Sequence, residues 1–317
     1  MLTPSDVHGV MAMMPAFATA DAADIHATAT VDVGNLERGL DRMIQDGVDV
    51  IATSGSFGEF HTLLWEEFVT LTRATVEVTR KRVPLFIGCT ALHSREVVRR
   101  MEVARDAGAT GVLVGIPFYF PSTVDNAVRF LGDIANLFPT LGIMIYHNPA
   151  LHHVNLPAGA FERILEHKNI IAMKDSHRDT RAFLKLMSVT KGRLSVFVNA
   201  AQLYPYAQLG AAGCWNYEMW MGPWPVLRLR DAVAAGDVAT ATEIIAQIST
   251  ESSPPLEWRE TAAKIAIRHA GYCDPGPLRP PFVVIPKDVD DRAIARAKHW
   301  TALAEKYRTQ VRAPLAV

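Results

Sequence analysis

The 317-residue sequence is poor in cysteine, balanced in charge and free of long apolar runs. Its three cysteines, Cys89, Cys214 and Cys273, lie far apart without metal-ligand spacing, so we expect reduced thiols in a cytoplasmic protein. Thirty-two lysines and arginines balance 33 acidic residues, which argues against nucleic-acid binding and against a polybasic membrane anchor. No run of about 18 uncharged apolar residues occurs and no signal-peptide pattern begins the chain, so we expect neither membrane insertion nor secretion.

The sequence does contain a regular alternation of short apolar strands and amphipathic helical stretches. We predict strands over residues 9–14, 48–53, 84–88, 111–115, 141–146, 170–174, 194–198 and 212–216. Helical periodicity follows in 35–47, 64–80, 94–107, 123–137, 158–167, 179–188, 202–209 and 224–235. Eight strand–helix repeats predict an α/β fold, the (β/α)8 TIM barrel. The alternative, a doubly wound open sheet, usually carries a glycine-rich phosphate loop after its first strand, which is absent here.

Helical periodicity continues beyond the eighth repeat, over residues 238–250, 257–270 and 289–308. No linker rich in glycine, serine or proline separates this part from the barrel. We therefore predict a barrel at residues 1–236 and a C-terminal helical extension at residues 237–317 that packs on it.

One lysine ends a predicted strand, in the apolar run Asn169-Ile-Ile-Ala-Met-Lys174. Burial among apolar side chains favours the neutral form of an amine, and a neutral lysine amine can attack a ketone to form a Schiff base. The active site of a (β/α)8 barrel lies at the C-terminal ends of its strands, where Lys174 is expected. The alternative is an ordinary strand-end lysine whose long side chain reaches solvent.

The preceding strand ends in Tyr146, followed by His147, Asn148 and Pro149. Neighbouring strands of the barrel would bring the phenol of Tyr146 beside Lys174, where it could relay a proton to or from a reacting oxygen. A buried tyrosine whose hydroxyl group bonds to the backbone is the alternative.

Histidines at positions 147, 152 and 153 suggest a metal site at first sight. However, no carboxylate accompanies them in this stretch, and adjacent histidines in a strand-end loop point apart. We predict no metal and no other cofactor.

Two further segments stand at predicted strand ends. In Gly55-Ser-Phe-Gly-Glu59 two glycines flank Ser56 and Phe57, and a tight turn there could direct backbone N–H groups and the serine hydroxyl at a carboxylate. A plain strand-to-helix turn is the alternative. The segment from Ala212 to Trp224 is dense in aromatic and thioether side chains, which form a core or an interface more often than a pocket. For Trp215 we favour a place in a pocket for a flat apolar substrate.

Taken together, these segments resemble the dihydrodipicolinate synthase and N-acetylneuraminate lyase superfamily of class I aldolases over nearly the whole chain. The components occur in one order: Gly9-Val-Met-Ala-Met-Met-Pro15, Gly55-Ser-Phe-Gly-Glu59, Gly108-Ala-Thr-Gly111, Pro117-Phe-Tyr-Phe120, Tyr146, Lys174 and Gly276-Pro-Leu-Arg279-Pro-Pro281. The resemblance implies that Lys174 is the Schiff-base lysine and that Tyr146 is the proton relay.

Within this superfamily the chain is most similar to the hydratase-aldolases that cleave benzylidenepyruvates in the bacterial breakdown of polycyclic aromatic hydrocarbons. The supporting features are Phe57 in place of a second threonine, Trp65-Glu-Glu67, Tyr146-His-Asn-Pro149, Trp215 and Gly276-Pro-Leu-Arg-Pro-Pro-Phe282. Ala150-Leu-His-His153 lacks the arginine with which the synthases bind a second carboxylate, which argues against an aspartate-semialdehyde substrate. Ser56 stands for the usual threonine and retains a hydroxyl.

The resemblance implies cleavage of a substituted trans-benzylidenepyruvate to an aromatic aldehyde and pyruvate. Gly55, Ser56 and Phe57 would hold the pyruvyl carboxylate, and Trp215, Phe57 and Phe118 would pack on the aryl ring, with Asn148 as a further substrate-binding residue. Arg259 would bind an ortho-carboxylate, which favours 2'-carboxybenzalpyruvate over the o-hydroxy substrate; a solvated helix charge is the alternative.

Two other functions stay open from the sequence. One is a lyase or dehydratase of the superfamily that acts on a sugar-derived 2-keto acid, for which the aromatic strand-end segment is unsuited. The other is a ligand-binding barrel without turnover, since a fold does not guarantee catalysis. The expected partners are small molecules, and the resemblance implies a homotetramer.

Overall fold

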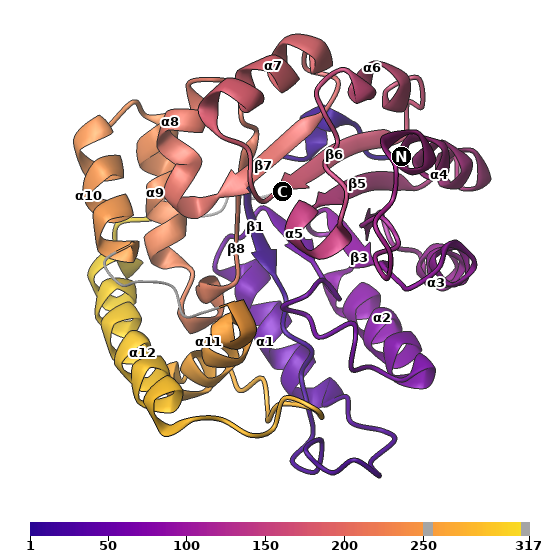
Figure 1. Ribbon diagram of the computed structural model, residues 1–317. Helices are drawn as coiled ribbons and strands as arrows, with labels where there is room; N and C mark the ends of the chain where they lie inside the picture. Colours follow the sequence, from indigo (N-terminus) through magenta and orange to yellow (C-terminus); the bar gives the residue numbers. More distant parts are fainter. Residues whose placement is uncertain (250–255, 312–317) are drawn as a thin grey trace. The chain divides into compact units, whose positions relative to one another are not determined.

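The computed structural model describes residues 1–249 and 256–311 and is a closed barrel of parallel strands (Figure 1). The strands are β1 (Gly9–Met13), β2 (Val50–Ala52), β3 (Leu85–Gly88), β4 (Gly111–Val114), β5 (Gly142–His147), β6 (Ile170–Asp175), β7 (Ser195–Asn199) and β8 (Gly213–Asn216). Their order around the barrel is their order in the chain. The predicted (β/α)8 fold is confirmed, and each predicted strand end lies within two residues of the observed one.

Helices alternate with the strands along the chain. They are α1 (Val33–Gln45), α2 (Trp65–Thr79), α3 (Ser94–Ala107), α4 (Val124–Leu137), α6 (Ala160–Ile164), α7 (Thr180–Thr190), α8 (Leu203–Ala207) and α9 (Trp224–Ala234), followed by α10 (Val238–Ile248), α11 (Leu256–Ala270) and α12 (Lys287–Arg308). The short helix α5 (Pro149–His152) was not predicted, because one turn is too short to show helical periodicity. The predicted end of the helix over 238–250 lies outside the described residues.

Helix starts are encoded locally. The side chains of Asp32, Thr123, Asp179 and Asp237 accept hydrogen bonds from backbone N–H groups in the first turns of α1, α4, α7 and α10. Such caps satisfy donors that the helix itself cannot pair, so these helices begin where the sequence supplies a short polar side chain. None of the described helices is long and apolar enough to cross a membrane.

The chain forms two compact units, which we describe separately. The first comprises residues 1–11, 49–55 and 84–215 and contains most of the strands together with α3 to α8. Its core consists of apolar strand residues that are almost fully buried, such as Val112, Leu113, Ile143 and Phe197. Strand β1 is bonded to the residues that immediately precede β8 and β2. Gly9 donates its backbone N–H to the Ala212 carbonyl, and Asp49 donates its backbone N–H to the Val10 carbonyl.

The second unit comprises residues 12–48 and 56–83 and the described residues from 216 onward, with α1, α2 and α9 to α12. Its core contains the fully buried indoles of Trp220 and Trp300, whose N–H groups donate to the carbonyls of Met13 and Gly222. The predicted boundary between residues 236 and 237, and the packing of the extension on the barrel, stay predictions.

A buried ionic cluster holds two distant segments of the second unit together. The Glu59 carboxylate lies 2.5 Å from the Lys264 amine and 2.7 Å from the Arg279 guanidinium. Lys264 also donates to the carbonyls of Ala16 and Pro277, and Arg279 to those of Phe17 and Thr30. Burial lowers the pKa of Lys264 to about 8, although Glu59 opposes this. Glu59 and Arg279, which belong to segments that carry the family resemblance, are thus structural anchors.

Close approach of the backbone at the junction of β8 and β1 requires glycine. A Cβ added at Gly213 would lie 2.0 Å from the carbonyl oxygen of Gly9. We predict that Gly213→Ala lowers the free energy of unfolding by at least about 2 kcal/mol, because the two strands must separate to admit the methyl group. Chemical denaturation measures the change. Gly159→Ala is the matched control, since a Cβ there meets no atom within 4 Å; equal stabilities of the two variants would contradict the prediction.

Candidate active site

Tyr146 and Lys174 occupy corresponding positions at the C-terminal ends of β5 and β6. The two residues are partners in the parallel register, and both side chains are buried, with Lys174 only 4% exposed. The Lys174 amine lies 4.3 Å from the centroid of the Tyr146 ring. An amine and a phenol that were predicted to be neighbours from separate segments therefore lie side by side.

Trp215, at the end of β8, supplies a second ring to the same amine. The Lys174 nitrogen lies 3.7 Å from the Trp215 ring centroid, a distance at which the ring face stabilises a cation. The indole N–H donates to the backbone carbonyl of Asp175 over 3.1 Å, which holds the ring in this orientation. Lys174 also donates to the Ser176 hydroxyl at 3.4 Å. The amine thus contacts two aromatic rings and the Ser176 hydroxyl group.

A second group of buried polar residues lies next to this pair in the sequence. His147 follows Tyr146 and Asp175 follows Lys174, and the His147 Nδ1 atom lies 3.1 Å from a carboxylate oxygen of Asp175. Arg178 contacts the same oxygen at 2.9 Å. Burial is the main cause that lowers the pKa of His147 to about 4. Although burial opposes it, hydrogen bonding to His147 and the charge of Arg178 lower the pKa of Asp175.

Sequence reasoning missed Asp175 and Arg178. The available indication was an aspartate immediately after the lysine that ends the apolar run, with an arginine three residues after that aspartate in the polar segment Asp175-Ser-His-Arg178. Charged residues in such a place need partners, but the sequence does not show which ones.

His152, in α5, packs against the Tyr146 ring. Its ring meets that of Tyr146 edge to face, with centroids 4.9 Å apart, and lies 6.5 Å from that of Phe118. Glycine at position 115 makes room for it, because a Cβ there would lie 2.4 Å from the imidazole. Burial lowers the pKa of His152 to about 3, and the nearby charge of Lys174 acts in the same direction. His152 is therefore neutral at physiological pH.

The predicted substrate-binding residues divide between the two units. Gly55, Phe118, Asn148 and Trp215 belong to the unit that contains Lys174. The Phe118 ring lies near the His152 ring, which in turn packs on Tyr146. Asn148 is partly exposed and immediately precedes α5.

Ser56, Phe57 and Arg259 belong to the other unit. There Phe57 stacks on Tyr217 with ring centroids 4.9 Å apart. Burial raises the pKa of Tyr217, and the positive charge of the exposed Arg259 opposes this rise. Phe57, Tyr217 and Arg259 are thus neighbours within their own unit.

His147, Asp175 and His177 bring three potential metal-ligand atoms within 4.8 Å of one another. The Arg178 guanidinium already contacts the shared Asp175 oxygen, and the Nε2 atom of His147 accepts a hydrogen bond from the backbone N–H of Leu156. A positive side chain at this oxygen would repel a metal ion. The donor set therefore fits an internal ion pair, and we assign no metal to it.

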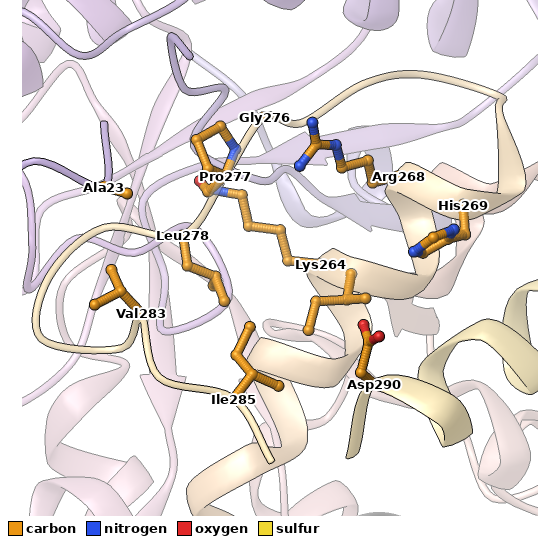
Figure 2. Close-up of a pocket in the computed structure, with 11 residues that line it drawn as sticks. Ala23, Lys264, Arg268, His269, Gly276, Pro277, Leu278, Val283, Ile285 and Asp290 are labelled. Atoms are coloured by element: carbon orange, nitrogen blue, oxygen red, sulfur yellow. The ribbon is translucent and has the colours of Figure 1, made fainter. Parts of the chain in front are cut away.

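A cavity of about 230 Å³ lies in the second unit, lined by α11 residues and by the segment that follows Gly276 (Figure 2). Figure 2 shows the Lys264 side chain extending toward Pro277, whose carbonyl its amine contacts at 2.8 Å. Because this amine is also paired with Glu59, it has no capacity left for a ligand. The cavity therefore adds no second nucleophile.

Comparison with known proteins relates the whole chain to one family. Residues 14–298 match the model of the dihydrodipicolinate synthetase family. The trans-O-hydroxybenzylidenepyruvate hydratase-aldolase of Pseudomonas aeruginosa is 30% identical, over 98% of this chain and 97% of that protein. The trans-2'-carboxybenzalpyruvate hydratase-aldolase of Nocardioides sp. (strain KP7) is 25% identical over 96% of each chain. The solved structure of PhdJ bound to a substrate intermediate superimposes with a TM-score of 0.92, at 27% identity, over 96% of this chain and 99% of that one.

Two buried neutral histidines predict acid sensitivity. His147 and His152 have pKa values of about 4 and 3 in the folded protein, whereas an unfolded histidine titrates near 6.5. The unfolded chain therefore binds more protons between pH 6.5 and pH 4, and the free energy of unfolding falls as the pH falls through this window. Each histidine should lower the free energy of unfolding by about 2 kcal/mol when the pH falls from 7 to 5.

Urea denaturation of the His152→Gln variant at pH 7 and at pH 5 measures how much of this loss of stability is due to His152. We expect the loss of stability between pH 7 and pH 5 to be smaller by about 2 kcal/mol in this variant than in the wild type. His153→Asn is the matched control, because His153 is exposed and should leave the difference unchanged. An unaltered pH difference in His152→Gln would show that this histidine does not stay neutral on folding.

Proposed function

The chain belongs to the dihydrodipicolinate synthetase family, and from this premise we propose that it is a Schiff-base-forming hydratase-aldolase. Its proposed reaction is the cleavage of a substituted trans-benzylidenepyruvate to an aromatic aldehyde and pyruvate, the chemistry of polycyclic aromatic hydrocarbon catabolism. It is a carbon–carbon lyase, like the hydratase-aldolases to which it is similar over nearly its whole length. The observation that carries the proposal is the buried Lys174 amine between the Tyr146 and Trp215 rings at the barrel strand ends.

The reaction begins when the Lys174 amine attacks the C2 ketone and water leaves, which gives an iminium. The iminium withdraws electrons through the conjugated side chain, so a water molecule adds at the benzylic carbon C4, and the enamine that results is protonated at C3, which regenerates the iminium. Removal of the proton from the new hydroxyl group then breaks the C3–C4 bond, releases the aldehyde and sends the electron pair of that bond into the iminium. The electron pair remains as a pyruvate enamine, which is protonated at C3 and hydrolysed to pyruvate and the free amine.

Each residue near Lys174 suits one part of this sequence. Tyr146 would carry protons to and from the C2 oxygen as the amine adds and water leaves. The Trp215 face, close to the lysine nitrogen, would stabilise the positive iminium as it stabilises the ammonium. Phe118 would pack on the aryl ring, and Asn148 would contact the substrate near Tyr146.

We assign recognition of the pyruvyl carboxylate to the turn that begins at Gly55. The hydroxyl group of Ser56 and the backbone N–H groups of Ser56 and Phe57 are the proposed donors, and two or more such donors would fix the ketone for attack. Phe57 would also contact the aryl ring.

The ortho substituent distinguishes two substrates in this reaction class. An o-hydroxyl group needs a neutral hydrogen-bonding partner, whereas an ortho-carboxylate needs a cation. Arg259 is exposed, is close to Tyr217 and is the proposed cation, which favours 2'-carboxybenzalpyruvate.

We further propose that the protein works in the cytoplasm as a homotetramer. Tyr119, Phe120 and Val284 are more than 70% exposed, which supports association through apolar surface. Size determination in solution tests this proposal.

Borohydride reduction tests the Schiff base directly. We expect borohydride with pyruvate, but not borohydride alone, to add the mass of a reduced pyruvyl group to the peptide that contains Lys174. Lys174→Arg should form no adduct, because it keeps the charge without a nucleophilic amine. Tyr146→Phe should still be trapped, but it should cleave benzylidenepyruvate about 10²-fold or more slowly. An adduct on a different lysine would refute the assignment.

Substrate competition tests Arg259. We expect Arg259→Ala to lower kcat/KM for 2'-carboxybenzalpyruvate by about 10-fold or more and to change it little for o-hydroxybenzylidenepyruvate. Arg268→Ala is a matched control, since Arg268 is also exposed on α11. If Arg259→Ala changes kcat/KM equally for the two substrates, Arg259 does not bind the ortho-carboxylate.

A further inference from the structure

The buried polar residues behind the catalytic pair have no part in the reaction proposed above. His147 and Asp175 are partners in the β5–β6 register, one step beyond Tyr146 and Lys174. Since successive residues of a strand point to opposite faces, these two side chains point away from the face that carries the phenol and the amine. Both are at most 3% exposed.

These residues form a closed ring of hydrogen bonds with Leu156 and Arg178. The backbone N–H of Leu156 donates to His147 Nε2 at 3.1 Å, which places the proton of the neutral imidazole on Nδ1. Nδ1 lies 3.1 Å from the Asp175 oxygen that accepts this proton and 3.2 Å from an Arg178 nitrogen. Arg178 contacts the same Asp175 oxygen at 2.9 Å, and its other terminal nitrogen donates to the Leu156 carbonyl. Every member is at most 5% exposed. The ring therefore links the end of β5, the end of β6 and the segment after α5.

The peptide that the ring holds also carries the contacts of the catalytic amine. The Asp175 carbonyl accepts the Trp215 indole N–H, and the Trp215 ring face lies 3.7 Å from the Lys174 nitrogen. Ser176, whose hydroxyl group the Lys174 amine contacts, donates its backbone N–H to the His147 carbonyl at 3.2 Å. A shift of the Asp175 peptide would therefore move the amine, the indole and the hydroxyl group together.

A buried ion pair is a poor source of stability, because desolvating two charges costs about as much as their attraction returns. The Asp175–Arg178 pair is nearly inaccessible to water, and its carboxylate and guanidinium have fully specified partners. Hydrogen bonds are directional, so these bonds restrain the position of the Asp175 segment more narrowly than apolar packing would.

We propose that the ring of Asp175, His147, Leu156 and Arg178 is a positioning device that sets the Lys174 amine against the Trp215 face. The inference rests on the proposed function, since it assumes that Lys174 is the nucleophile. Asp175, His147 and Arg178 are positioning residues that touch no substrate. Asp175 acts through its carbonyl on Trp215, and His147 and Arg178 act by holding Asp175.

The test compares how fast borohydride traps pyruvate on Lys174 in a set of variants. Asp175→Asn removes the negative charge of the carboxylate that Arg178 and His147 contact. Trp215→Phe keeps an aromatic ring but removes the N–H group that donates to the Asp175 carbonyl. We expect each to slow trapping at saturating pyruvate by about 10- to 100-fold, because small displacements of a nucleophile have effects of this size. The pyruvate concentration for half-maximal trapping should stay within about twofold of wild type, since the proposed carboxylate donors are unchanged.

The double variant Asp175→Asn/Trp215→Phe separates positioning from general damage. If Asp175 acts through Trp215, the double variant should be no slower than the slower single variant, because the second change breaks a connection that is already lost. Effects that multiply would refute the inference, as would trapping by Asp175→Asn at the wild-type rate.

His177→Gln is the matched control, because the exposed His177 lies 3.4 Å from the same carboxylate but is outside the ring. It should trap pyruvate within about twofold of the wild-type rate. If Asp175→Asn does not fold, His147→Phe takes its place under the same two criteria, since it keeps a ring and the ion pair but removes both nitrogens. If the wild type forms no Lys174 adduct, the proposed function itself fails; if the wild type is trapped and the variants behave additively, only the positioning role fails.

Discussion

Strands β5 and β6 pair so that Tyr146 lies opposite Lys174 and His147 lies opposite Asp175. This register decides which side chains can react, because a slip of one residue would exchange the two faces and turn the amine away from the phenol. The closed barrel maintains the register, since every strand is held by two neighbours and no free edge remains. The chemistry on one face and the hydrogen-bonded ring on the other thus depend on the same pairing.

Buried charge is used in the same manner in both units of the chain. In the first unit Asp175 and Arg178 are surrounded by specified partners, and in the second unit Glu59 binds Lys264 and Arg279. Such clusters connect segments that are far apart in the sequence, at places where apolar packing would allow several arrangements. Among the residues that the structure describes, Lys174 and Lys264 are nearly fully buried, but their surroundings differ. Lys264 is paired with the Glu59 carboxylate, whereas the Lys174 amine lies against the Tyr146 and Trp215 rings.

Much of the fold could be predicted because its determinants are local. Alternating strand and helix periodicity indicated the barrel, and capping side chains such as Asp179 mark where helices begin. Lys174, Tyr146 and Trp215 could be selected because each lies at the end of a predicted strand or one residue before it, and the strand ends of a barrel meet on one side. Asp175, His147 and Arg178 could not be connected in this way, since their partnership depends on the register of two strands and on the Leu156 segment, which the sequence does not specify.

The sequence by itself determined the fold class and the family likeness and singled out Lys174 as the proposed reacting amine, because all three depend on residue order and on patterns within single elements. Tertiary structure alone decided what surrounds that amine. The distance of Lys174 from Trp215 joins β6 to β8, and the proton on His147 Nδ1 follows from a donor nine residues later in the chain. Such contacts depend on how the backbone closes into a barrel, and so they become visible only when the strands are assembled.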